Sequence, residues 1–190
     1  MVQVSASDGA ESIKKAGTES VTFRLAKELL TTIKKEAEQK EISTNTLVTQ
    51  VLRHHVDWNS NAAKAGLLSF PRSLLVKLME GYDQEEIARI AKQVATKDVA
   101  DITLLLRSDY SIESFLHVVR SWITACGFPF QQSVTGSEHT YVIQHDMSMK
   151  WSKYFADVFE SVFEQIGSAR PEFRLTDNTF VFKVKLTPGR

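Results

Sequence analysis

The sequence predicts an α+β protein, with a strand–helix–helix unit at the N-terminus, a helical connector, and a βαββαβ domain at the C-terminus. Polar and apolar residues alternate at 20–25, and two segments with helical spacing of apolar residues follow. Beyond residue 98, strand-like runs alternate with two long amphipathic segments. We expect four regions: a disordered arm at 1–18, a first domain at 19–58, a linker and helical connector at 59–98, and a second domain at 99–190.

The composition is that of an ordinary globular protein. Of the 190 residues, 43% are hydrophobic and 24% charged, and the formal net charge is zero. A neutral chain is poorly suited to coating nucleic acid indiscriminately. The single cysteine, Cys126, excludes an internal disulfide and suits a reducing compartment. With no apolar run long enough for a membrane span and no signal-peptide pattern, we expect a cytoplasmic protein with no membrane partner.

The first strand is expected at Ser20–Leu25. Alternation places Val21, Phe23 and Leu25 on one face and Ser20, Thr22 and Arg24 on the other. Two helices should follow, one over 26–40 and one that Ser43 begins as its N-cap. About 40 residues are too few to bury a core alone, so the pattern favours a twofold dimer with paired strands.

Residues 20–58 resemble the ribbon-helix-helix family of DNA-binding repressors, of the Arc, MetJ and CopG type. The resemblance rests on V-T-F-R-L, then L-L-x-x-I-x-x-x-A, then I-S-x-x-x-L-V-x-x-V-L. It implies that paired strands enter the major groove of double-stranded DNA, with Ser20, Thr22 and Arg24 contacting bases. It further implies phosphate contacts at the start of the second helix, from Ser43, Thr44 and Asn45.

Two positions depart from that family. Ala26 begins the first helix where a serine, aspartate or proline is more usual. Glu41 stands where a glycine commonly ends the first helix, so this turn either avoids a left-handed residue or carries strain. Further along, Pro71 predicts the start of a helix that Gly81 ends, and Asp83 with Glu86 predicts a capping box for the next helix.

The C-terminal elements are expected in the order strand, helix, strand, strand, helix, strand. The run Ile102–Leu106 is interpreted as a buried strand, although a helix is the alternative for so short an apolar run. The rest are a helix that Ser111 caps and Gly127 ends, a hairpin of Phe128–Val134 and Thr140–His145, a helix at Met149–Ile166, and strands at Phe173–Thr176 and Thr179–Leu186. This order is that of a ferredoxin-like domain, with Gln131, Gln144, Lys183 and Lys185 on its uncovered sheet face.

One stretch of this domain is a candidate effector site. It lies where a strand leads into a helix, and its residues are His145, Asp146, Ser148, Lys150 and Trp151. A helix N-terminus beside a histidine, a lysine and a tryptophan can bind a small anion or an aromatic molecule. The alternative is that Asp146 or Ser148 only caps the helix, while His145 satisfies a backbone carbonyl.

Metal binding and catalysis receive little support from the sequence. A DNA-binding ribbon followed by a ferredoxin-like domain resembles the nickel-responsive repressors, but His117, His139, His145 and Cys126 lack their ligand spacing. We therefore expect no metal site and no cofactor. None of the familiar hydrolase, phosphate-loop or zinc-protease motifs occurs, so we expect no catalytic residues and no enzyme activity.

The function expected from these patterns is sequence-specific transcriptional regulation. The N-terminal strands of a homodimer or higher homo-oligomer would read the DNA major groove, and the C-terminal domain would assemble subunits or sense a small-molecule effector. An antitoxin-like or assembly module that acts by protein interaction is the alternative. A small-ligand carrier or an enzyme centred on His145 and Asp146 is the third hypothesis.

Overall fold

The computed structural model describes residue 17 and residues 19–186, in two compact units that meet between Leu47 and Val48. The expected boundaries at residues 58 and 98 therefore do not coincide with the division into compact units. The arm expected at 1–18 lies almost wholly outside the described residues. Within the described part of the chain, no helix combines the length and the apolar character needed to cross a bilayer.

The N-terminal unit has one complete helix. The strand expected at Ser20–Leu25 is absent from the structure: residues 19–25 form neither helix nor strand, and α1 (Lys27–Gln39) follows them. Helix α2 (Thr44–His54) begins in this unit, and Ala37 and Leu47 are its buried apolar side chains. The two expected helices are therefore present. Val21 is 70% exposed and Phe23 is 62% exposed, so a single chain leaves the apolar face of 20–25 uncovered.

The turn between α1 and α2 has a left-handed residue that is not glycine. Glu41 has φ 54°, and the backbone N–H groups of Ile42 and Glu41 donate to the carbonyl oxygens of Ala37 and Glu38. The same pair of hydrogen bonds closes three other helical turns, where the left-handed residue is Gly66, Gly127 or Gly167. Because a side chain at positive φ crowds the following carbonyl, the turn at Glu41 is strained.

Two long helical segments contain π-helical turns. Helix α2 continues through η1 (His55–Asn59) into α3 (Ser60–Ala62). After α4 (Arg72–Glu80), helix α5 (Gln84–Gln93) continues through η2 (Val94–Val99) into α6 (Ala100–Arg107). The capping box at the start of α5 is confirmed: Asp83 Oδ1 accepts from Glu86 N at 2.8 Å, and Glu86 Oε2 accepts from Asp83 N at 3.0 Å.

The strand expected at Ile102–Leu106 is wrong, because these residues lie in α6. Thr103 is fully buried, and its hydroxyl donates to the carbonyl of Val99 one turn earlier, at 2.7 Å. The hydroxyl thus finds its acceptor within the helix, and Leu104 and Leu105 remain exposed. The alternative expectation for this apolar run, a helix, is therefore correct.

The sheet consists of two hairpins side by side. Helix α7 (Ile112–Cys126) precedes β1 (Phe130–Thr135) and β2 (Glu138–Gln144); helix α8 (Met149–Ile166) precedes β3 (Glu172–Leu175) and β4 (Thr179–Lys185). All neighbours are antiparallel, in the order β1-β2-β4-β3. The architecture is α+β, as expected, but this is not the ferredoxin-like order, because the first expected strand is a helix.

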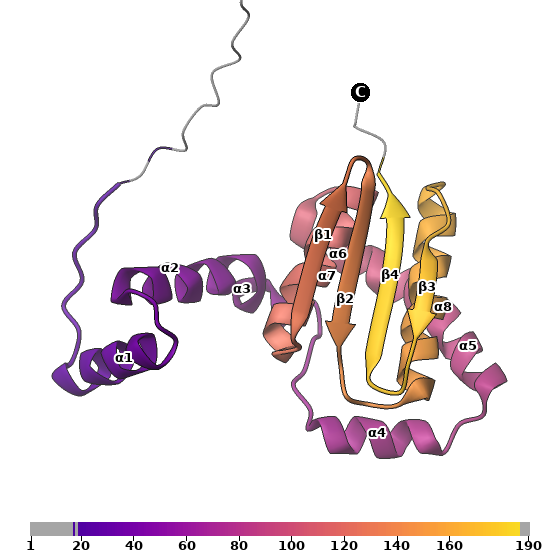
Figure 1. Cartoon of the computed structure of the whole chain (residues 1–190), viewed down its shortest axis with the longest axis horizontal. Helices are drawn as coiled ribbons and strands as arrows, with labels where there is room; N and C mark the ends of the chain where they lie inside the picture. The colour runs from indigo at the N-terminus through magenta and orange to yellow at the C-terminus, as the bar shows by residue number, and fades with distance from the viewer. Residues whose placement is uncertain (1–16, 18, 187–190) are drawn as a thin grey trace, which may run out of the picture. The chain divides into compact units, whose positions relative to one another are not determined.

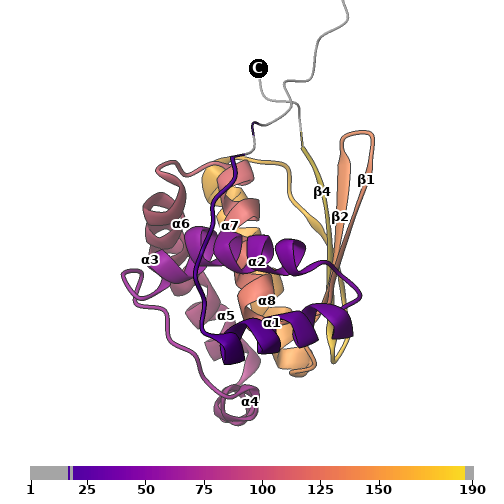
Figure 2. The same ribbon diagram turned by 90° about the vertical axis from the view of Figure 1, so that its left-hand side faces the viewer.

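Within the C-terminal unit the helices cover one face of the sheet (Figure 1). Figure 2 shows the sheet nearly edge-on, with α7 and α8 against it and α5 and α6 beyond them. One hydrophobic core joins the sheet, the helices α7 and α8, and helix α5 with η2. Ala91 and Ala95, from the expected connector, lie in the same cluster as side chains of α7, α8, β2 and β4. Aromatic rings fill its centre, including Phe155, Phe159, Phe163, Phe180 and Phe182.

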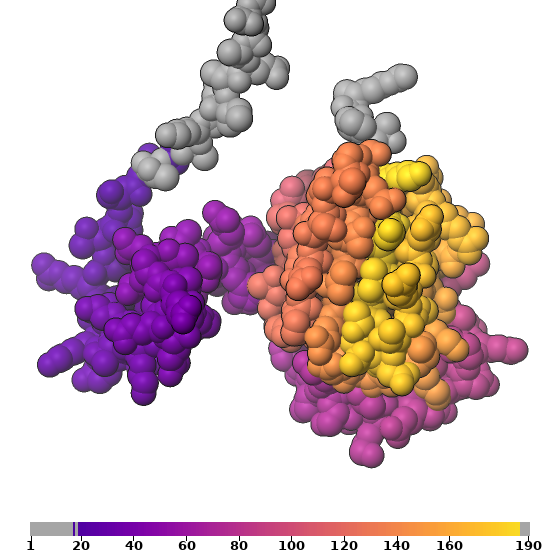
Figure 3. Space-filling view, in the orientation of Figure 1, coloured from indigo at the N-terminus to yellow at the C-terminus, as the bar shows by residue number. Residues whose placement is uncertain are grey.

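Within the described part of the C-terminal unit, no helix lies in front of the other face of the sheet (Figure 3). The register places Gln131, Gln144, Lys183 and Lys185 on this face, and all four are exposed, as the alternation predicted. The two edges differ in character. Strand β1, with the sequence FQQSVT, has no charged residue, whereas β3 at the opposite edge carries Glu172 and Arg174.

Candidate functional site

The residues expected to contact DNA bases lie on the surface of the N-terminal unit. Ser20, Thr22 and Arg24 are all exposed, and no hydrogen bond or ion pair joins Arg24 to another described residue. These residues form neither helix nor strand, and their neighbours Val21 and Phe23 are exposed as well. The guanidinium is therefore free of intramolecular partners in the described part of the chain.

The first turn of α2 is capped as the sequence predicted. Ser43 Oγ accepts from the backbone N–H of Thr46 at 3.0 Å, and it also lies 2.7 Å from the Thr46 hydroxyl. The first N–H groups of a helix have no acceptor within it, so those of Thr44 and Asn45 are available to an outside group. Ser43 and Asn45 are exposed, and Thr44 is half-buried.

The structure gives His145 a role inside the fold. The side chain is fully buried; its Nδ1 accepts from the backbone N–H of Met147 at 3.1 Å, and its Nε2 lies 2.8 Å from Ser152 Oγ. The Ser152 hydroxyl donates to the carbonyl of Thr176 at 2.5 Å. Because Nδ1 is an acceptor, the proton is on Nε2, which donates to Ser152. Burial lowers the pKa of His145, with Asp146 acting against the shift and Arg72 adding to it.

Both ring nitrogens of His145 are thus occupied, which leaves no atom to act on a substrate or ligand. The network ties the end of β2 to the start of α8 and to the turn between β3 and β4. The backbone N–H groups of His145 and Asp146 both donate to the carbonyl of Asn178, which strengthens the same connection. His145 was expected, as an alternative, to satisfy a backbone carbonyl; it reaches one only indirectly, through the Ser152 hydroxyl that donates to Thr176.

Two other residues of the expected effector site, Lys150 and Asp146, make contacts within the fold, whereas the side chain of Ser148 makes none that caps its helix. Lys150 Nζ donates to three carbonyl oxygens at the end of α4, with distances of 3.4, 3.1 and 2.5 Å to Met79, Glu80 and Tyr82. It therefore caps that helix, where a positive charge is favourable. Asp146 accepts from Gln144 Nε2 and lies 3.8 Å from Arg72 Nη1. Ser148 is the N-cap residue of α8, but its side chain makes no capping hydrogen bond.

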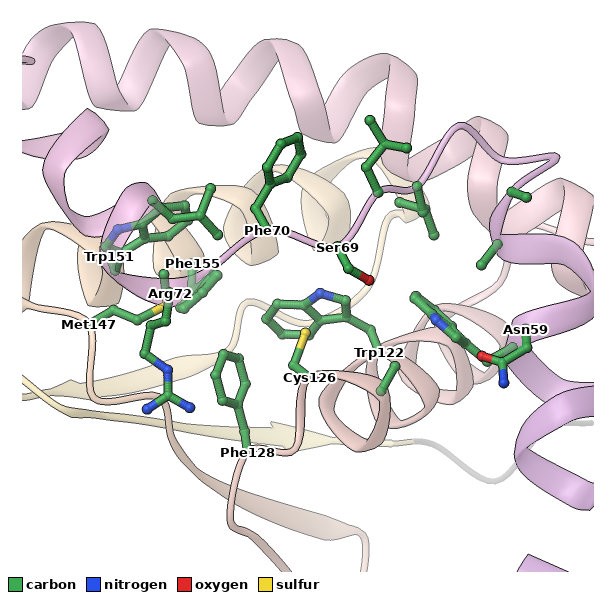
Figure 4. Close-up of a pocket in the computed structure, with 17 residues that line it drawn as sticks. Asn59, Ser69, Phe70, Arg72, Trp122, Cys126, Phe128, Met147, Trp151 and Phe155 are labelled. Atoms are coloured by element: carbon green, nitrogen blue, oxygen red, sulfur yellow. The ribbon is translucent and has the colours of Figure 1, made fainter. Parts of the chain in front are cut away.

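Trp151 alone of this group lines a cavity. The cavity has a volume of about 570 Å³ and lies within the C-terminal unit, between the end of the α2–η1–α3 helix, the stretch 67–70, α4, α7 and the start of α8. Figure 4 shows Trp122 and Cys126 of α7 facing Ser69 and Phe70, with Arg72, Phe128 and Met147 alongside. Six of its 17 lining residues are aromatic, and aliphatic side chains supply much of the remaining wall. The indole N–H of Trp151 is itself buried and has no acceptor among the described residues.

Among the residues that the structure describes, Arg72 is the only charged side chain in the cavity wall. Its guanidinium carbon lies 5.4 Å from the centre of the Phe128 ring, an arrangement that attracts a cation to an aromatic face. Burial raises the pKa of the Cys126 thiol, and the charge of Arg72 lowers it by less. Cys126 is thus a neutral thiol at pH 7, and a neutral thiol is a poor nucleophile.

Sequence reasoning missed this cavity except for Trp151. Its walls come from segments that are up to about a hundred positions apart, and no spacing rule connects them. The one local signal was the stretch Leu67–Phe70, which places large apolar residues in a segment with no helical or strand periodicity. In the structure these residues form neither helix nor strand, and Leu68 is 77% exposed.

His117, His139 and His145 lie apart from one another in the structure. No group of three His, Cys, Asp or Glu side chains among the described residues is placed to hold a metal ion. His139 stacks beside Tyr141, with ring centres 6.4 Å apart, and His117 is half-buried on α7. Burial is the largest cause of the lowered pKa of His117.

Comparison with models of protein families found no match to this chain, and comparison with curated protein sequences found none either.

Proposed function

We propose that the protein is a dimeric, sequence-specific DNA-binding regulator, whose residues 20–25 pair with the same residues of a second copy. The observation that carries the proposal is that all six side chains of this segment are exposed in a single chain, in a sequence where apolar Val21, Phe23 and Leu25 alternate with polar neighbours. An extended segment with an uncovered apolar face is a poor end state in water. A second copy supplies both a pairing edge and an apolar surface.

The helices add to the surface that a second copy would cover. Leu29 and Leu30 of α1 are exposed, and so are Val51 and Leu52 of α2. Full burial of one side chain of this size contributes about 1.5–3 kcal/mol. Several such side chains from each chain are enough to offset the entropy lost on association, which is estimated at about 4–15 kcal/mol.

In such a dimer the polar face of the paired strands would enter the major groove. Arg24 has the fork of donors that matches O6 and N7 of guanine, and the hydroxyls of Ser20 and Thr22 suit several base edges. The N–H groups at the start of α2, near Thr44 and Asn45, would position the dimer on phosphate oxygens. Residues 19–58 carry six basic and six acidic residues, so binding would depend on these placed contacts rather than on general attraction.

The C-terminal unit would then assemble subunits or respond to a ligand. Its large aromatic core makes it the more robust part of the chain, and its polar sheet face and its cavity are both accessible to other molecules. The antitoxin-like or assembly alternative uses the same N-terminal dimer but derives its function from a protein partner.

Selection of bound sequences from random double-stranded oligonucleotides tests this function directly. The full-length protein is expected to enrich two copies of one short half-site, as inverted or direct repeats, because a twofold dimer presents the same strands twice. The Arg24→Ala variant, selected in parallel, is expected to lose the preference at one position of each half-site. Failure of the parent protein to enrich any sequence at moderate salt would contradict the proposal.

A further inference from the structure

We infer that the cavity beside Trp151 binds a small amphipathic anion: an organic carboxylate with an apolar or aromatic body. This site is separate from the proposed DNA contacts and does not depend on the proposed function. It also differs from the effector site expected from the sequence, of which only Trp151 lines the cavity.

Size and lining fit a small organic ligand. Ligand pockets have volumes of about 300–1,000 Å³ and are lined mainly by apolar and aromatic side chains with a few polar groups. This cavity, at about 570 Å³, falls within that range. All three tryptophans of the chain contribute to its wall: Trp58, Trp122 and Trp151. Trp122 packs edge-to-face against Phe128 and Phe155, with ring centres 5.6 and 5.5 Å away, so the aromatic wall is well supported.

The charge of the lining selects an anion. In the described part of the chain, no carboxylate lines the cavity, and Arg72 is its only cationic side chain. The one acidic partner of Arg72 among the described residues is Asp146, at the long distance of 3.8 Å, and the Arg72 side chain is 43% exposed. The contact of the guanidinium with the Phe128 ring, at 5.4 Å, uses none of its N–H donors. A guanidinium placed in this way can take a carboxylate through two parallel hydrogen bonds.

The rim of the cavity indicates an apolar body for the ligand. Leu68 and Phe70 line the cavity and are 77% and 54% exposed, although both are large apolar residues. They belong to a stretch with neither helix nor strand, so no regular element holds them in place. Removing such side chains from water is favourable, and a chain or ring lying between them and Trp122 would cover them.

Octanoate and 1-octanol form a matched pair of probes, because they share the apolar chain and differ in charge. Since the only tryptophans of the protein line the cavity, tryptophan fluorescence of the full-length protein reports occupancy directly. Octanoate is expected to give a saturable change in emission. Arg72→Gln should weaken the affinity for octanoate about tenfold, because it removes one charged contact. It should leave the affinity for octanol within about twofold of the parent value. The octanoate affinity of Arg72→Lys should lie between those of the parent and Arg72→Gln.

Two further variants locate the binding. Lys77→Gln removes the same charge from the exposed surface of α4, outside the cavity wall, and should bind both probes as the parent does. Ala125→Phe fills the cavity from α7 and should abolish the binding of both probes while thermal unfolding stays cooperative. Three results would overturn the inference: no saturable response to octanoate, equal octanoate affinity in Arg72→Gln and the parent, or unchanged octanoate binding by a folded Ala125→Phe variant.

Discussion

The imidazole Nε2 of His145 lies 2.8 Å from the hydroxyl oxygen of Ser152, and both side chains are completely buried. This hydrogen bond connects the end of β2 to the first turns of α8, and the serine passes the connection on to the β3–β4 turn at Thr176. The residue that the sequence presented as a candidate for chemistry therefore holds three elements together.

We expect acid to destabilise the protein through His145. Burial lowers its pKa in the folded state, so the neutral form is favoured there and the unfolded chain takes up the proton first. The contribution of neutral His145 to the free energy of unfolding is therefore present above the ordinary histidine pKa of about 6.5, and it is lost as the pH falls below that value. Thermal unfolding measured at pH 7.5 and at pH 5.5 should show that this drop in pH lowers the melting temperature less in His145→Asn than in the parent. His117, whose pKa is also lowered by burial, remains in both proteins and contributes equally.

Ser152→Ala should lower the free energy of unfolding by about 1–3 kcal/mol, because the N–H of His145 would be left buried without an acceptor. Chemical denaturation at pH 7.5 measures this difference. Ser161→Ala provides a control on the same helix, at a partly exposed position, and should change stability by less than about 0.5 kcal/mol. Similar values for the two variants would show that the His145–Ser152 hydrogen bond contributes little.

Glu41→Gly should stabilise the protein by roughly 0.5–1 kcal/mol. Glycine adopts the positive φ of this turn without a Cβ clash, although it adds entropy to the unfolded chain. The reverse change at an equivalent turn, Gly167→Glu, should destabilise by a similar amount. Thermal unfolding followed by circular dichroism checks both signs, and a stabilising Gly167→Glu would refute the explanation.

Arg24→Ala is expected to cost about 1–3 kcal/mol of binding free energy on the selected DNA site. Thermal stability should hardly change, because the side chain is exposed and has no partner among the described residues. Titration of labelled DNA at fixed salt measures the affinity. Lys97→Ala, which removes one exposed positive charge from the C-terminal unit, is the matched control and should bind as the parent does.

If the proposed dimer forms through residues 20–25, Phe23→Lys should give a monomer that remains folded. The side chain is 62% exposed in a single chain, so its replacement removes almost no contact within one molecule. Sedimentation analysis gives the mass, and tryptophan emission reports the fold of the C-terminal unit. Leu105→Lys places the same charge at another exposed apolar position and should leave the dimer intact. A Phe23→Lys protein that stays dimeric would place the interface elsewhere.

Local signals in the sequence predicted most helix ends correctly. Ser43, Ser111 and the Asp83–Glu86 pair cap the helices that they were expected to cap, and α8 covers Met149–Ile166 as predicted. These signals work because a cap depends on residues within one turn of each other. The strand order could not be predicted in this way, since it depends on which hairpin edges meet across the sheet.

The apolar run at 102–106 shows where local reasoning ends. Five apolar or neutral residues in a row suit a buried strand or a buried helix equally well, and only the packing of α6 distinguishes them. The cavity is a stronger case. Arg72, Trp122 and Phe128 become neighbours only through the tertiary fold, and none of them stood out in the sequence. For Ser20, Thr22 and Arg24, the structure places the side chains on the surface, and their contacts with DNA stay a prediction.

The uncharged edge of β1 affects how the protein should be handled. Unpaired strand edges without charges invite intermolecular addition of further strands, which can grow into aggregates in concentrated solution. On β3 the side chains of Glu172 and Arg174 guard against this, but β1 has no such protection. A lysine introduced at the exposed Ser133, in the middle of β1, is therefore the simplest way to improve solubility without touching the core.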